Sequence, residues 1–246
     1  MRYAIISDIH ANLEALRAIL KDIKSQRVDK VVCLGDIVGY YPNPNECTKH
    51  CRKHGFLCIR GNHDDAALEL CDIDDFNPIA QTALIWTAKK LKEEYKDWLH
   101  ELPDHLLVDD SFLAVHGSPW DPYAYIFSSD SALRAFSHMS ANYAHINLCF
   151  FGHTHQRALY TSEEDAIQEV TSGERYILGE RGVFLINPGS VGQSRDGKPG
   201  ASYLIYNSEK REIVFRHVSY NIDLTQRKVA AAGLPLTLAE RLSLGC

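Results

Sequence analysis

The sequence of 246 residues has no apolar run that approaches the roughly 18 residues needed to span a membrane. Met1-Arg2-Tyr3 leads straight into Ala4-Ile5-Ile6, without a basic region followed by a long apolar one, so we expect no signal peptide. The net charge is −6, and lysine and arginine form no block. Proteins that grip nucleic acid through its phosphates usually show a basic face. We therefore expect neither a membrane partner nor stable nucleic acid binding.

A disulfide framework is also missing. The seven cysteines are odd in number and include no Cys-x-x-Cys pair, so neither a set of disulfides nor a thiolate zinc site is indicated. Cys33, Cys58 and Cys149 lie in apolar runs, where free cysteine behaves as a small buried hydrophobe. This usage predicts a cytoplasmic protein. A small phosphorylated substrate is compatible with the acidic balance, because bound metal can supply local positive charge.

Linkers, internal repeats and low-complexity segments are absent as well, and we expect a single domain over residues 1–246. The first sixty residues alternate predicted strands with predicted helices, which favours an α/β fold class and a largely parallel sheet. The predicted strands are 3–7, 30–34 and 56–59, and the helices are 13–26 and 45–54. Later predictions are a helix at 78–102, a hairpin of 106–108 and 112–115, a helix at about 130–142, strands ending at 151 and spanning 183–186, 201–206 and 212–218, and a helical tail.

Polar clusters follow the predicted strands, and ligands of open α/β sheets sit at the carboxyl ends of strands. The last cluster is Gly152-His153-Thr154-His155. Residues two apart in an extended segment point to the same side, so both of its imidazoles can face one site. A His-x-His pair by itself is weak support for a metal, since a surface turn with two solvated histidines has the same sequence. The other strand ends supply further candidates, namely Asp8, His10, Asp36, Asn62 and His116.

These seven side chains comprise two carboxylates, one amide and four imidazoles. Seven donors are too many for one tetrahedral ion. They suit two ions that share a bridging carboxylate, an arrangement that clamps the attacking and leaving oxygens of a displacement at phosphorus. The mixture of nitrogen and oxygen ligands suits Mn, Fe, Zn, Ni or Co better than Ca or Mg. We therefore expect two divalent transition metal ions as cofactors.

Five motifs in order give the sequence a family resemblance. They are Asp8-Ile9-His10, Gly35-Asp36, Gly61-Asn62-His63-Asp64, His116-Gly117 and Gly152-His153-Thr154-His155. The set resembles that of the calcineurin-like metallophosphoesterases. The stretches Ser7 to Leu13 and Asn187-Pro188-Gly189-Ser190-Val191-Gly192 are similar to those of its small bacterial and archaeal phosphodiesterase branch, and they extend the likeness to about residue 206.

The resemblance implies a four-layer α/β/β/α sandwich of two mixed sheets flanked by helices. It implies that Asp36 bridges two ions, with the other ligands divided between them: Asp8, His10 and His155 on the first, and Asn62, His116 and His153 on the second. It also implies that a metal-bound hydroxide attacks phosphorus in line, while His63 protonates the leaving alkoxide. Two divalent ions, two carboxylates and a hydroxide sum to about +1, which suits an approaching phosphoryl group.

One departure narrows the function within the family. Related protein serine/threonine phosphatases continue after Gly-Asp with an acidic residue and an arginine, whereas here Gly35-Asp36-Ile37-Val38 is followed by Gly39-Tyr40-Tyr41. The missing acid and arginine disfavour a protein phosphatase. Asp64 is then a candidate to orient His63, the alternative being an exposed acid at a helix start.

Several residues have two open interpretations. Arg195 either binds substrate phosphate or forms a surface turn with Asp196, and Asn12 either donates to phosphate or caps the helix that follows it. Tyr40 and Tyr41 either stack on a base or pack against the protein. The aromatic segment 120–127 is a lid or substrate wall, or it packs on the hairpin, and the polar segment 163–173 is a hairpin turn or flexible edge.

The remaining histidines match no motif. His50 and His54 lie four apart on a predicted helix with Cys47 and Cys51, which permits a metal cluster, although a solvated helix face explains the same spacing. The leading functional hypothesis is a dinuclear phosphodiesterase of small or nucleotide-like esters. Alternatives are a phosphomonoesterase, a dinucleoside polyphosphate hydrolase and a metal-binding scaffold without catalysis. Oligomeric state, metal identity and physiological substrate do not follow from the sequence.

Overall fold

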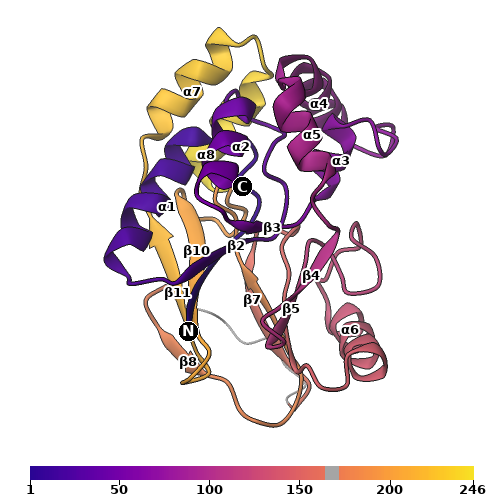
Figure 1. Ribbon diagram of the computed structural model, residues 1–246. Helices are drawn as coiled ribbons and strands as arrows, with labels where there is room; N and C mark the ends of the chain where they lie inside the picture. The colour runs from indigo at the N-terminus through magenta and orange to yellow at the C-terminus, as the bar shows by residue number, and fades with distance from the viewer. Residues whose placement is uncertain (164–171) are drawn as a thin grey trace.

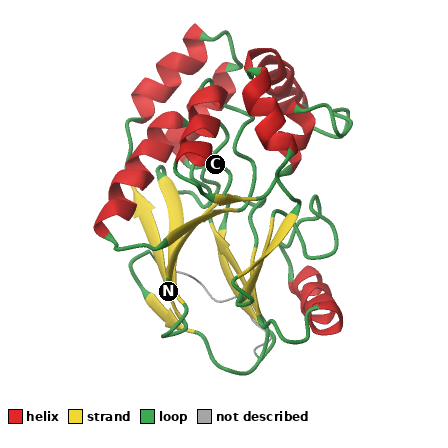
Figure 2. Cartoon of the chain, in the orientation of Figure 1, coloured by secondary structure: helices red, strands yellow, loops and turns green. Residues whose placement is uncertain are grey.

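The computed structural model describes residues 1–163 and 172–246 and contains two β-sheets packed face to face, with helices on their outer sides (Figures 1 and 2). Both sheets are mixed, as the resemblance implies, and the predicted sandwich is confirmed. The first sheet has the order β3 (Leu57–Cys58), β2 (Lys30–Cys33), β1 (Arg2–Ile6), β10 (Ala201–Asn207), β11 (Glu212–Val218) and β8 (Arg175–Ile177). The second has the order β4 (His105–Val108), β5 (Phe112–Val115), β6 (Leu148–Phe150), β9 (Phe184–Pro188) and β7 (Arg157–Thr161).

The helices of the described residues cover the outer faces of the two sheets (Figure 1). Helix α6 (Ser129–Asn142) packs on the second sheet, where Ala135 and Met139 meet Phe151 and Leu185. The first sheet is covered by α1 and its neighbours, through a cluster that contains Leu16 and Ile19. Besides α6, the described helices are α1 (Leu13–Ser25), α2 (Pro44–Lys53), α3 (Asn62–Ala67), α4 (Pro78–Lys90), α5 (Glu93–His100), α7 (Ile222–Ala231) and α8 (Leu236–Leu244). Helices α4, α7 and α8 pack together in a separate cluster with Tyr40 and Tyr41.

Strand β1 is buried on both of its faces. Tyr3 and Ile5 pack between the sheets against Phe112 and Phe150, whereas Ala4 and Ile6 alternate with them and face the helical layer. A strand buried on both sides reads as a continuous apolar run, because successive side chains point to opposite faces. The middle of the sandwich is therefore a closed hydrophobic layer, and polar groups are left to the strand ends.

Strand register brings the polar clusters to one edge. Ile6 pairs with Cys33 and Cys33 pairs with Cys58 in parallel register, so β1, β2 and β3 end together. In the second sheet, Ala114 pairs with Phe150 in the same parallel sense, so β5 and β6 also end together. The segments that follow these five strands carry all seven predicted metal ligands.

The structure corrects one predicted element and adds two strands. Residues 78–102 do not form one helix, because Leu91 is extended (φ −67°, ψ 126°) and separates α4 from α5. Strands β7 and β8 lie outside the predicted strands, and most of the predicted turn or edge at 163–173 falls outside the described residues. The hairpin and the helical tail are confirmed as β4–β5 and α7–α8.

The first sheet joins strands from both ends of the chain, since β1 pairs with β10. This pairing favours the single domain over residues 1–246, which stays a prediction. Among the described helices, none combines the length and the apolar character that a membrane crossing requires.

Candidate metal centre

Five of the predicted ligands adopt left-handed backbone conformations. Their φ angles are 54° at Asp8, 49° at His10, 53° at Asp36, 66° at His153 and 61° at His155. Residues other than glycine rarely adopt this region, and each such residue costs about 1–3 kcal/mol unless its surroundings hold it. Neighbouring backbone bonds hold them here, for example His10 N–H to Asp36 O at 2.8 Å. The loops therefore turn sharply and aim these side chains at a common centre.

The first ligand group consists of Asp8, His10, Asp36 and His155, whose donor atoms all lie within 4.8 Å of one another. All four side chains are buried. His155 Nδ1 lies 2.7 Å from the carbonyl oxygen of Gln193, which only accepts hydrogen bonds, so Nδ1 carries the proton and Nε2 presents its lone pair. That Nε2 lies 3.0 Å from His10 Nε2 and 3.4 Å from Asp8 Oδ1. The arrangement is a cluster of convergent electron-pair donors.

The second ligand group shares Asp36 with the first and adds His116 and His153. His116 Nδ1 lies 2.7 Å from Leu34 O, so this nitrogen donates and Nε2 faces inward, 3.0 Å from Asn62 Oδ1. His153 is held the other way round. Its Nε2 lies 3.0 Å from the carbonyl oxygen of Tyr123, which leaves Nδ1 as the electron-pair donor.

The shared carboxylate oxygen Asp36 Oδ2 is the link between the groups. It lies 3.5 Å from His10 Nε2 and 3.4 Å from His116 Nε2. Although it is buried, it has no hydrogen-bond partner among the described residues, whereas Asp36 Oδ1 accepts from His63 N–H at 2.9 Å. A buried carboxylate oxygen without a partner is costly, and bound cations are a common remedy. The donor set and this orphaned oxygen fit divalent metal ions. The first group has the four residues that the resemblance implies, and the second has three of its four, with Asn62 Oδ1 beside His116.

Burial and mutual charge perturb the pKa values of the cluster. Burial lowers the pKa of His153 to about 3 and keeps the pKa values of His10 and His155 well below the usual value, so these imidazoles are neutral and able to ligate. Burial also raises the pKa of Asp8 to about 7. His116 is the exception: burial acts to lower its pKa, but the carboxylates of Asp36 and Asp8 raise it to about 10. Without metal, His116 therefore supplies the cation that balances Asp36.

His63 stands beside both groups without belonging to either. Its ring packs against His10 and Tyr40, with centroids 4.6 and 4.5 Å away, and its Nδ1 is buried without a hydrogen-bond partner among the described residues. A Cβ atom at Gly39 would come within 2.7 Å of that Nδ1, and Gly39 has φ +133°, so this position requires glycine. Burial lowers the pKa of His63 to about 4, which keeps the ring neutral until an anion arrives.

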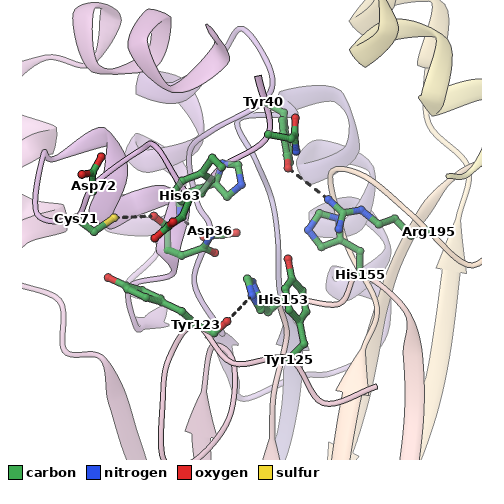
Figure 3. A pocket seen from close by; sticks show the side chains of 14 residues that line it. Asp36, Tyr40, His63, Cys71, Asp72, Tyr123, Tyr125, His153, His155 and Arg195 are labelled. Carbon is green, nitrogen blue, oxygen red and sulfur yellow. Dashed lines mark hydrogen bonds between the residues drawn. The ribbon is translucent and has the colours of Figure 1, made fainter. Parts of the chain in front are cut away.

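A cavity of about 480 Å³ opens from the cluster to solvent. Figure 3 shows Arg195 and Tyr40 on one side of it and His63 with Asp72 on the other. Arg195 Nη2 lies 3.4 Å from the Tyr40 hydroxyl and 3.0 Å from Gln193 Oε1, and Asp196 pairs with Arg157 instead. The structure thus places Arg195 in the wall of the cavity and not in a surface pair with Asp196.

The aromatic segment 120–127 also forms a wall of this cavity. Tyr123 and Tyr125 line it, and the Tyr125 ring stacks on His153 with centroids 3.9 Å apart and planes 18° apart. Trp120 instead packs with the α6 layer and lies under the Arg134 guanidinium, 4.4 Å from the ring centroid. Tyr123 and Tyr125 thus form part of the cavity wall, whereas Trp120 packs against a cluster that includes Leu113 and Val115 of the hairpin.

Comparison with known proteins agrees with this geometry. A family model described as the calcineurin-like phosphoesterase superfamily domain matches residues 1–211. The chain belongs to this superfamily. An uncharacterized protein of Methanocaldococcus jannaschii is 39% identical over 249 residues, which cover 98% of this chain and 97% of that protein.

Two solved structures extend the comparison. A metallophosphoesterase from Sphaerobacter thermophilus, known from a crystal structure, is 39% identical to this chain, with a TM-score of 0.86 and coverage of 100% of this chain and 99% of that chain. A hypothetical protein from Pyrococcus horikoshii has the same fold, with 18% identity, a TM-score of 0.81 and coverage of 100% and 98%. The predicted family is thereby confirmed.

Two other residues that the sequence left open, Asn12 and Tyr41, contact the protein and do not reach the cavity. Asn12 is fully buried and is the N-cap of α1: its Oδ1 accepts from Ala15 N–H at 3.2 Å, and its Nδ2 donates to Gly192 O and Tyr220 OH. Asn12 is absent from the described residues that line the cavity, so the structure favours the capping interpretation. Tyr41 is buried as well and donates to Leu238 O, whereas Tyr40 reaches the cavity.

Asp64 lies in the first turn of α3, so it is an acid at a helix start as one interpretation has it, but the expected exposure is wrong. It is fully buried, and its carboxylate accepts from the backbone N–H groups of Ile37, Val38 and Gly61 at 3.2, 2.9 and 3.1 Å, with no hydrogen bond to His63 among those of the described residues. Asp64 therefore joins the loop after Asp36 to the start of α3. The His50 and His54 rings stack with centroids 5.8 Å apart, and no metal-ligand group among the described residues includes them.

Several supporting residues had no signal in the sequence beyond their place in a motif. Asn187 Nδ2 donates to Gly152 O at 2.7 Å and holds the loop that carries His153 and His155. Ser190 Oγ donates to Asp8 O at 2.9 Å. Phe76 lines the cavity from an acidic segment that carries no site motif. Their positions depend on contacts between segments that are distant in the chain.

Proposed function

We propose that this metallophosphoesterase is a phosphodiesterase that uses two divalent transition metal ions to hydrolyse small or nucleotide-like esters. The observation that carries the proposal is Asp36 Oδ2, which is buried, has no hydrogen-bond partner among the described residues and lies 3.5 Å from His10 Nε2 and 3.4 Å from His116 Nε2. A bridged pair of ions requires one carboxylate oxygen between two groups of imidazoles that are neutral or can lose their proton when metal binds.

The first ion would be held by Asp8, His10, Asp36 and His155, and the second by Asp36, Asn62, His116 and His153. When bound, the ions would supply Lewis acidity to the phosphoryl oxygens and make a water nucleophile available near neutral pH. The protein holds the ligands by backbone hydrogen bonds, since Asp8 accepts from His153 N–H at 3.2 Å and the outer nitrogens of His116 and His155 donate to carbonyl groups. Fixed outer contacts of this kind orient ligands before the ion arrives.

Arg195 would bind the anionic oxygens of the substrate. Its guanidinium lies beside Tyr40 and lies close enough to Tyr125 for its charge to act on that hydroxyl. Both tyrosines line the same cavity. A guanidinium with adjacent hydroxyl donors is a common anchor for phosphoryl oxygens. Because a phosphodiester carries one negative charge and a monoester close to two, one fixed cation beyond the ions suits the diester.

His63 would donate a proton to the leaving alkoxide. Burial keeps its pKa near 4 in the free protein. An anionic phosphoester bound beside it would raise that pKa, because opposite charge favours the imidazolium. Proton donation of this kind typically contributes about 10²–10⁴-fold to the rate. The cavity continues past His63 toward Phe76, which leaves room for the second alcohol of a diester.

A cytoplasmic location is also proposed, and it is supported by the seven cysteines, all of which are free thiols. The proposed function is tested by metal analysis of the purified protein, followed by hydrolysis of bis-nitrophenyl phosphate and nitrophenyl phosphate with Mn, Fe, Zn and Ni. We expect close to two ions per chain and a preference for the diester. A protein that holds no transition metal and gains no turnover with any of them would be a scaffold, and the proposal would be wrong.

A further inference from the structure

The cavity is electrically asymmetric. Arg195 is the one arginine or lysine among the described residues that line it, and it lies on the Tyr40 side. The opposite wall comes from the segment between α3 and α4 and carries two carboxylates, Asp72 and Asp75, together with Phe76 and Asn77. In Figure 3, Asp72 and Arg195 lie on opposite sides of the cavity, with His63 and Asp36 between them. The anionic oxygens of a bound phosphoester and its leaving alcohol would therefore experience electrostatic potentials of opposite sign at the two ends of the cavity.

His63 fixes which end of the substrate meets the acidic wall. Its ring packs edge-on against Phe76, with centroids 5.2 Å apart and planes 88° apart. His63 is only 4% exposed, and it faces the same cavity as the two acids. A proton donor must lie within hydrogen-bond reach of the atom that it protonates. The alcohol that leaves with the help of His63 therefore projects toward Phe76, Asp72 and Asp75, and the anionic oxygens project toward Arg195.

The acidic wall is a poor surface for further phosphate groups. Like charges at contact range repel, and a polyphosphate chain beyond the reacting phosphorus would place several negative charges beside two carboxylates. A cationic alcohol would gain from the same carboxylates and from the faces of Phe76 and Tyr123, because aromatic rings attract cations at close range. The wall thus discriminates by the charge of the leaving alcohol.

Resting on the proposed function, we infer that Asp72 and Asp75 select phosphodiesters whose leaving alcohol is cationic or neutral and exclude those that carry additional phosphate or carboxylate. Substrates of the amino-alcohol or neutral aromatic class fit this wall. Dinucleoside polyphosphates, which extend the negative charge along the chain, do not.

The test uses three methyl phosphodiesters that share one phenol and differ only in a para substituent: trimethylammoniomethyl, neopentyl or carboxymethyl. The methylene group weakens the effect of the charge on the phenol, and the difference in leaving-group basicity that remains is the same for the wild type and the variant, so it cancels in their ratio. With the Mn-loaded protein at low salt, kcat/KM should fall from the cationic to the anionic ester by about 10-fold. The Asp72→Asn, Asp75→Asn variant should reduce that span to about 2-fold. The Asp74→Asn variant is the matched control, since Asp74 is exposed, lies between the two and is outside the cavity lining.

Calorimetric titration with the corresponding non-hydrolysable phosphonates supplies a second readout that needs no turnover. If the phosphonates bind in the same order and the Asp72→Asn, Asp75→Asn variant loses that order, the selection by charge is supported. If this holds while every ester resists hydrolysis, only the proposed function is wrong. Turnover or binding that is equal for all three substituents, or a span that the double variant leaves unchanged, overturns the selection and leaves the proposed function standing.

Discussion

The Tyr123 hydroxyl donates to Asp65 Oδ2 at 2.8 Å, while the carbonyl oxygen of the same tyrosine accepts from the Nε2 of His153 at 3.0 Å. Asp65 is fixed in turn, because its Oδ1 accepts from Arg60 Nε at 2.7 Å. One residue of the aromatic segment thus ties helix α3, which begins with Asn62, to a ligand from the other sheet. This connection joins the two halves of the site, as do the bonds of His116 Nδ1 to Leu34 O and of His153 N–H to Asp8.

Removal of the Tyr123 hydroxyl, which tethers the aromatic segment to Asp65, should lower the affinity for the second ion. In a Tyr123→Phe variant, Asp65 keeps Arg60, so we expect the fold to be retained, while the carbonyl that orients His153 becomes less fixed. Loss of such outer contacts typically costs about 10–100-fold in metal affinity. The measurement is the affinity of the weaker-bound ion by chelator competition, with Tyr143→Phe as the control. Unchanged affinity would show that the His153 orientation does not depend on the Tyr123 hydroxyl.

Replacement of His63 should slow the hydrolysis of esters, and the loss should be larger for esters with poorer leaving groups. In a His63→Ala variant we expect a loss of about 10²–10⁴-fold with alkyl esters and a much smaller loss with nitrophenyl esters, which need little protonation. A plot of log kcat against leaving-group pKa measures the difference as a steeper slope. His54→Ala, on the exposed end of α2, should match the wild type. An equal loss for both classes of ester contradicts the proton-donor role.

Removal of metal should lower thermal stability. An ion present at 100 times its dissociation constant stabilises the folded state by about 2.7 kcal/mol. For a chain of this size, that free energy corresponds to a Tm change of roughly 5–10 °C. Calorimetry with and without a chelator measures the change. The His153→Ala, His155→Ala double variant should lose both the change and the turnover, and a double variant with wild-type activity would refute the site.

Metal affinity should rise steeply with pH. The carboxylates hold the pKa of His116 at about 10, so binding displaces its proton anywhere below that pH. Burial holds the pKa of Asp8 at about 7, so a second proton is displaced below pH 7. Apparent affinity should therefore increase up to about 10-fold per pH unit above pH 7 and up to about 100-fold per unit below it.

The displaced protons can be counted directly. Calorimetric titrations with Mn are done in buffers of different ionisation enthalpy. The slope of the observed binding enthalpy against the buffer ionisation enthalpy gives the number of protons released, which should be about one at pH 8 and closer to two at pH 6. Heats that are independent of the buffer at both values would mean that His116 is already neutral before metal binds.

Asp64 should be a stability residue. The Asp64→Ala change leaves three buried backbone N–H groups, of Ile37, Val38 and Gly61, without an acceptor, and we expect a loss of about 3 kcal/mol in the free energy of unfolding. Asp64→Asn keeps one acceptor oxygen and should lose less. Urea unfolding followed by circular dichroism measures both. If Asp64→Ala instead unfolds like the wild type and alters only the His63 titration, Asp64 orients the histidine after all.

The sequence by itself determined where the first strands end and which side chains are candidate ligands. Apolar runs such as Tyr3 to Ile6 predict buried strands because strand periodicity is local, and parallel strands that end together put Asp8, Asp36 and Asn62 at one edge. The order of the motifs added the family. None of these inferences depends on a contact between distant segments, so local sequence patterns are enough to make them.

Only the tertiary structure decided what surrounds the ligands. The Asp64 carboxylate, the Tyr123 tether and the Arg195 guanidinium owe their positions to loops that pack against one another, and Tyr123 lies 58 residues from its partner Asp65. A loop has no periodicity that reports which way a side chain points, so the sequence left Arg195 and Asn12 open and misjudged Asp64. The break at Leu91 has the same origin, since Asn45, far away in the chain, accepts the Lys92 N–H at 2.8 Å. Local pattern fixes the elements, whereas packing of the loops fixes the chemistry at their ends.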